Sequence, residues 1–82
     1  GKPENITKRV FLYGQDVFED PGQDYSIHDV MQILAKTYPD LGNGSWAIQY
    51  VPDPAIPGGS IEEVTFVKNM GEKGQAADLG PA

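Results

Sequence analysis

Alternation of apolar and polar residues predicts two β-strands at the start of the chain. Between residues 6 and 13 the side chains form two sets at a period of two, with Ile6, Val10 and Leu12 on one face and Thr7, Arg9, Phe11 and Tyr13 on the other. We assign the first set to the core. Gly14 then permits a tight turn into a second strand over 17–19, which ends before Pro21 because proline cannot donate to a sheet.

A helical repeat comes next. Apolar residues recur at the i, i+3, i+4 and i+7 positions, namely Ile27, Val30, Met31 and Leu34, and this spacing gives one stripe for packing. Ser26 can cap the first turn, and Asp29 stands three positions later, where its charge complements the helix dipole. Because Pro39 disfavours helical geometry at the preceding residue, we expect the helix to end between 36 and 38.

Two further strands are predicted in the second half of the chain. Trp46, Ile48 and Tyr50 alternate with smaller or polar residues and indicate a strand over 46–51. The stretch 52–59 contains three prolines and two glycines and is typical of a loop. High β-propensity over 62–68 favours a last strand, and the small, aperiodic residues of 71–82 are typical of a flexible tail.

This order of elements predicts an α+β fold of the β-grasp, or ubiquitin-like, type. A helix that crosses right-handedly between two hairpins sets the first and last strands side by side and parallel. The result is a ββαββ mixed four-stranded sheet with the helix on one face. We expect this domain to span 6–70, between a flexible N-terminus at 1–5 and the tail at 71–82. The helix stripe should pack on Val10, Leu12, Ile48 and Phe66.

Size and charge narrow the classes of function. A chain of 82 residues has room for one domain, and a domain this small favours binding over catalysis because it supports a deep pocket poorly. Its net charge of −6 is unsuited to neutralising phosphates, so neither nucleic acid nor an anionic membrane is an expected partner. The sequence shows no apolar run of membrane-spanning length, and residues 1–5 lack the apolar stretch of a signal peptide, so we expect a cytoplasmic protein. We also expect a monomer.

No residue pattern predicts enzymatic chemistry. His28 is the single histidine, and no cysteine or Gly-x-Ser-x-Gly elbow accompanies it as a nucleophile. The carboxylates at 19–24 and 62–63 lack the spacing of a calcium loop. We therefore expect no catalytic residue, no metal and no cofactor, and we interpret the acidic residues as a solvated surface that can steer a basic partner.

Aromatic residues provide the candidate binding patch. One helix covers only one face of a sheet, so the second face is expected to be open. Phe11 and Tyr13 lie opposite the assigned core face and, with Trp46 and Tyr50, can form a partner-binding surface there. The alternative is that the 52–59 loop or the chain ends cover them. An exposed sheet edge offers a second docking mode, by strand addition.

Several short motifs resemble a known family. They are Val10-Phe11-Leu12-Tyr13-Gly14, Glu19-Asp20-Pro21, Tyr25-Ser26, Tyr38-Pro39-Asp40-Leu41 and the run from Val64 to Gly74. In this order and spacing, over residues 6–74, the chain resembles PRTRC system protein C, a small bacterial ubiquitin-like family.

The resemblance implies a non-enzymatic β-grasp protein from a plasmid or mobile-element gene cluster. Such clusters also encode a ubiquitin-activating-enzyme-like protein and a JAB-type metallopeptidase, and either is an implied partner. The ending Gly71, Lys73 and Gly74 matches the family's terminus, but eight residues follow Gly74 here. Two functions therefore stay open. The chain acts as an adaptor that only docks, or its tail is removed at Gly74 or Gly80 and the new terminus is activated, as in a conjugated modifier or sulfur carrier.

Overall fold

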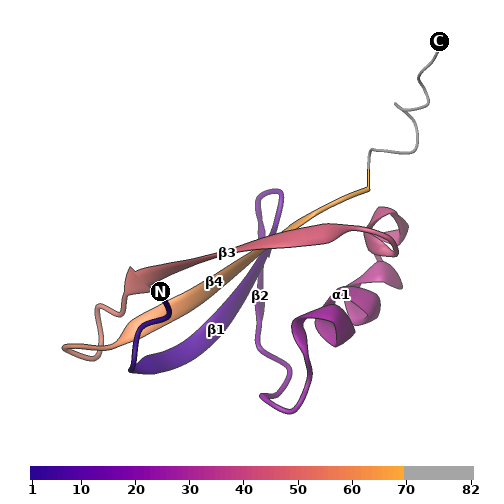
Figure 1. The fold of residues 1–82 in the computed structure, drawn as a ribbon. Helices are drawn as coiled ribbons and strands as arrows, with labels where there is room; N and C mark the ends of the chain where they lie inside the picture. Colours follow the sequence, from indigo (N-terminus) through magenta and orange to yellow (C-terminus); the bar gives the residue numbers. More distant parts are fainter. Residues whose placement is uncertain (70–82) are drawn as a thin grey trace, which may run out of the picture.

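The structure, a computed structural model, describes residues 1–69 and contains one α-helix, one short 3-10 helix and four strands within that range (Figure 1). In chain order the elements are β1 (Ile6–Tyr13), β2 (Asp16–Glu19), α1 (Ile27–Ala35), the 3-10 helix η1 (Pro39–Leu41), β3 (Ser45–Pro52) and β4 (Ser60–Val67). The predicted order is confirmed. The clearest difference in bounds is at β4, which begins two residues before the predicted start at residue 62.

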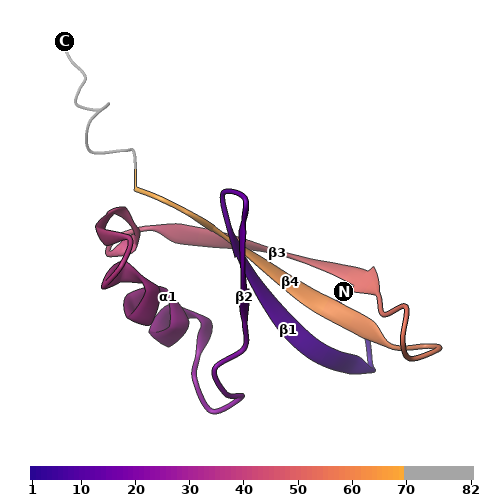
Figure 2. The same ribbon diagram turned by 180° about the vertical axis from the view of Figure 1, so that it is seen from behind.

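The four strands form one mixed sheet in the order β2-β1-β4-β3. The central strands β1 and β4 run parallel, whereas β2 and β3 pair antiparallel at the two edges. Views from the two sides place α1 on one face of this sheet, close to the start of β3 (Figures 1 and 2). The predicted α+β architecture, with a parallel central pair and a helix on one face, is therefore confirmed.

A capping box starts α1 at the predicted residue. The Ser26 hydroxyl accepts the Asp29 N–H at 3.0 Å, and the Asp29 carboxylate accepts the Ser26 N–H at 3.2 Å. Two backbone donors that the helix cannot satisfy internally are thereby paired. The helix ends at Ala35, and Pro39 opens η1 instead of continuing it.

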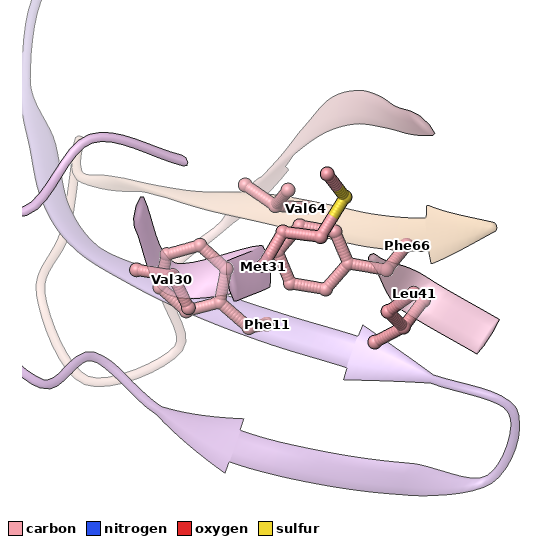
Figure 3. Packing of buried hydrophobic residues seen from close by; sticks show 6 residues of the cluster. All are labelled: Phe11, Val30, Met31, Leu41, Val64 and Phe66. Atoms are coloured by element: carbon pink, nitrogen blue, oxygen red, sulfur yellow. The ribbon is translucent and has the colours of Figure 1, made fainter. Parts of the chain in front are cut away.

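The core lies between α1, η1 and the central strands. Its fully buried members come from every one of these elements and are Phe11, Val30, Met31, Leu41, Val64 and Phe66 (Figure 3). In the helix stripe, Val30 and Met31 are confirmed as buried, and Ile27 and Leu34 pack at the margin of the cluster.

The prediction of which face of β1 lies in the core is wrong. Phe11 is 0% exposed beneath the helix, and the alternation of the strand turns Val10 and Leu12 to the opposite face of the sheet. Both sets are apolar enough to be buried, so periodicity separates them without indicating which set is inside. Phe66 is in the core as predicted, whereas Ile48 shares its face but is 41% exposed.

The short helix explains the exposure of Ile48. A helix of nine residues is about 13 Å long, and a strand of eight residues is about 26 Å long. The helix therefore covers only part of the sheet face, and β3 at the edge is left half-covered.

Candidate protein-binding surface

Phe11 and Tyr13 belong to the closed, helix-covered face. Phe11 stacks on Phe66 with ring centroids 5.7 Å apart. Tyr13, two residues on, is half-buried and meets the Tyr38 ring edge-on at 5.3 Å. The expectation that these two residues face the open side of the sheet is wrong, because core residues of α1, η1 and β4 cover this face.

Trp46 and Tyr50 lie on the same face as the helix, on the edge strand β3, which α1 covers only in part. Trp46 is 37% exposed, meets Phe66 edge-on at 6.5 Å and has the His28 ring 6.5 Å away. The Tyr50 hydroxyl donates to the Glu62 carboxylate at 3.2 Å. Burial and this hydrogen bond raise the pKa of Tyr50. The four predicted aromatics thus share one face, but Phe11 is closed to any partner.

Arg9 fills the end of this face that the helix leaves uncovered. Its guanidinium makes two hydrogen bonds to the Asp20 carboxylate, at 2.8 and 2.7 Å, and donates to the Gly22 and Tyr25 carbonyls. It also lies 5.1 Å from the Phe11 ring centre. The hydrogen bond from Arg9 lowers the pKa of Asp20. These contacts fasten the β2–α1 connection to the sheet.

Asp53 organises the loop between β3 and β4. It is 8% exposed, and its carboxylate accepts hydrogen bonds from the Thr7 hydroxyl and from the Ala55 N–H at 2.8 Å. The hydrogen bond from Thr7 is the largest reason that the pKa of Asp53 is lowered. The predicted loop at 52–59 is thus an ordered turn, and its buried carboxylate was not identified from the sequence because Thr7 lies 46 residues away.

The opposite face, which we call the open face, carries a row across all four strands that is apolar except for Thr65 on β4. Leu12 faces Val17 on β2 and Thr65 on β4, and Thr65 faces Ala47 on β3. Directly opposite residues in a sheet lie on the same face, so these four side chains form one line, the apolar row. Val17 is 66% exposed, and Thr65 and Ala47 are exposed as well.

An acidic row runs beside the apolar row. Val10 faces Glu19 on β2 and Glu63 on β4, and Glu63 faces Gln49 on β3. The Gln49 amide donates to the Glu63 carboxylate at 3.0 Å. On the other side of the apolar row, Val67 is 46% exposed. Single exposed apolar residues are common on proteins, whereas a continuous apolar row with charge along one side is the kind of surface that can dock a partner.

The sequence groups the β1 residues of the open face correctly but does not show that this face is the uncovered one. These residues, Val10 and Leu12, are the set that alternation separates from Phe11, and only the assignment of inside and outside was reversed. The other set was predicted to be the binding surface because it contains aromatic residues, which are enriched at interfaces.

The remaining site predictions concern the C-terminal residues, metal binding and membrane crossing. Gly71, Lys73, Gly74 and Gly80 lie outside the described residues. Among residues 1–69, no group of three or more His, Cys, Asp or Glu side chains is arranged to hold a metal ion. In the same range, no helix has the length and apolar character needed to cross a bilayer.

Comparison with family models, with curated proteins and with solved structures found no match to this chain.

Proposed function

We propose that this chain is a ubiquitin-like protein of the β-grasp type that acts as a protein-binding adaptor without catalysis of its own. The strand order β2-β1-β4-β3, with β1 and β4 parallel and a helix between the two hairpins, supports the β-grasp assignment. The observation that carries the binding role is the apolar row on the open face.

Partner chemistry follows from the two rows. Leu12, Val17 and their neighbours offer apolar contact, and Glu19 and Glu63 stand beside them. The complementary surface is therefore apolar at its centre and basic along one side. The net charge of −6 attracts a basic partner over a longer distance and makes association faster at low salt.

The motif resemblance to PRTRC system protein C decides which partner to test first. It implies an activating-enzyme-like protein or a JAB-type metallopeptidase encoded beside this chain. Calorimetry with each of these proteins, using the full chain, tests the proposal.

Two variants separate the open face from the rest of the surface. Val17→Glu and Val67→Glu place charge on exposed positions beside or within the apolar row, and we expect each to weaken binding about tenfold or more. The matched control is Ile33→Glu on α1, which is 39% exposed and should bind like the unmodified chain. Loss of binding in the control with none in the open-face variants contradicts the proposal.

The alternative, a conjugated modifier or sulfur carrier, depends on Gly74 or Gly80 outside the described residues. Intact mass spectrometry of the protein from its native cells distinguishes the two functions. The adaptor requires only the full-length mass. A species ending at a glycine, a thiocarboxylate or an isopeptide adduct supports the alternative.

A further inference from the structure

The two edges of the sheet differ in how they are protected. Native sheets protect an edge by shortness, charge, proline or a bulge, since its unpaired N–H and C=O groups can pair with another chain. β2 has four residues and has an acid at each end, Asp16 and Glu19. β3 has eight residues, Ser-Trp-Ala-Ile-Gln-Tyr-Val-Pro, with no charged side chain and no interruption in its pairing with β4. Only Pro52, at its last position, limits pairing.

The ladder with β4 shows which backbone groups face outward. The Asp53 N–H donates to the Gly59 carbonyl at 2.9 Å, and this pair continues the register in which Pro52 faces Ser60. Bonded and non-bonded pairs alternate in an antiparallel ladder. The odd-numbered residues of β3 are therefore bonded to β4, and Trp46, Ile48 and Tyr50 direct their N–H and C=O groups away from the sheet.

The side chains of these three residues share one face. The register pairs Trp46 with Phe66, Ile48 with Val64 and Tyr50 with Glu62, all on the helix side. Trp46 and Ile48 are also large apolar residues that are exposed, at 37% and 41%. Within residues 1–69, this edge thus presents unpaired backbone groups at three positions, two of which also carry exposed apolar side chains.

We propose that β3 pairs antiparallel with β3 of a second copy, across a two-fold axis at Ile48. A residue whose N–H and C=O groups point away from the sheet pairs with a residue of the same kind in the second copy. The register centred on Ile48 sets Ile48 opposite Ile48, and Trp46 opposite Tyr50, of the second copy. This pairing makes about six backbone hydrogen bonds, two for each bonded pair. It joins the two sheets into one.

Self-pairing gives the exposed Ile48 an apolar neighbour on the same face of the sheet. Phe11, Val64 and Ile48 form one row across the sheet, and the two-fold axis continues it with Ile48 and Val64 of the second copy. Each Trp46 gains an aromatic neighbour in Tyr50 of the second copy, a cross-strand pair that stabilises sheets. The strand brings no charge to the contact, which is why a second copy fits despite a net charge of −6.

This dimer replaces the monomer expected from the sequence. It is independent of the adaptor role, because the apolar row on the open face lies on the other side of the sheet and stays accessible.

Charge complementation at position 48 tests the register directly. Sedimentation velocity of the full chain between about 1 µM and 1 mM should show a dimer that strengthens with salt, since screening weakens the repulsion between like-charged copies. Ile48→Lys and Ile48→Glu should each sediment as monomers, because like charges then stand opposite each other. An equimolar mixture of the two should form a heterodimer. The control Val17→Lys, on the other edge strand, should dimerise like the unmodified chain.

Three results overturn the proposal: a monomer at every concentration, a dimer that Ile48→Lys leaves intact, or a mixture that does not pair. Amide exchange of the unmodified chain provides a test that needs no substitution. The N–H groups of Trp46, Ile48 and Tyr50 should exchange slowly at high concentration and rapidly on dilution, whereas that of Gln49 stays protected. Rapid exchange of these three N–H groups at all concentrations also contradicts the dimer. In that case a strand from another protein is the alternative occupant of the edge.

Discussion

Replacing Phe11 by alanine should remove much of the stability of the domain. The side chain is 0% exposed, stacks on Phe66 at 5.7 Å and has the Arg9 guanidinium 5.1 Å from its ring centre. Deleting a buried phenylalanine typically destabilises a protein by about 3–5 kcal/mol. A domain of this size has a free energy of unfolding of about 4–12 kcal/mol in total, so the loss expected for Phe11→Ala is a large fraction of it.

The matched comparison is Leu12→Ala. Leu12 is half-buried on the open face, so its truncation should cost only about 1 kcal/mol. The sequence interpretation requires the reverse ranking, since it placed Leu12 in the core and Phe11 outside.

Urea unfolding provides the measurement. The single tryptophan, Trp46, packs edge-on against Phe66 at 6.5 Å and reports the loss of the core by fluorescence, with far-ultraviolet circular dichroism as the second probe. Phe11→Leu retains most of the buried volume and should be less destabilised than Phe11→Ala. A larger loss for Leu12→Ala than for Phe11→Ala refutes the assignment of the faces.

Three further predictions concern contacts that position the elements. The pairing with Arg9 lowers the pKa of Asp20 in the folded state, so it stabilises the fold at pH values above the unfolded pKa of about 4. This stabilisation is lost as the pH falls through the folded pKa. Asp20→Asn should therefore flatten the acid limb of a stability–pH curve. A Cβ at Gly44 would lie 2.5 Å from the Val67 carbonyl oxygen, and Gly44→Ala should therefore lower the urea midpoint well below that of Gly42→Ala, whose Cβ meets nothing nearer than 3.4 Å. Ser26→Ala removes the cap of α1 and should reduce the free energy of unfolding by about 1 kcal/mol, with Ser26→Asp retaining most of it by thermal melts.

Local patterns in the sequence were sufficient to predict the order of the elements. The capping residues Ser26 and Asp29, the stripe through Val30 and Met31, and the prolines after the helix all act within a few residues of their position. Such short-range effects determine where a helix or strand begins and ends, and the structure places these elements close to the predicted bounds.

The inside of the sheet was not predictable in the same way. Arg9 shares a face with Phe11, and Lys8 shares the opposite face with Val10 and Leu12, so each set contains one charged residue and charge does not indicate which set is buried. The Arg9 charge is compensated by Asp20, 11 residues away, and a pattern within one strand does not reveal that pairing. The prediction that Phe11 and Tyr13 lie on the open side was wrong for the same reason, since that side was defined as the face of the sheet that the helix did not cover.

A short distance between a methyl group of α1 and a ring of β1 tests the account most directly. The central claim is that the helix packs on the Phe11 side of the sheet and leaves the Leu12 side open. Nuclear Overhauser spectra of the full chain should connect the Met31 side-chain methyl with the Phe11 and Phe66 rings, and should show no contact from Met31 to the Leu12 methyls. Strong contacts between Met31 and Leu12, with none to Phe11, would contradict the account.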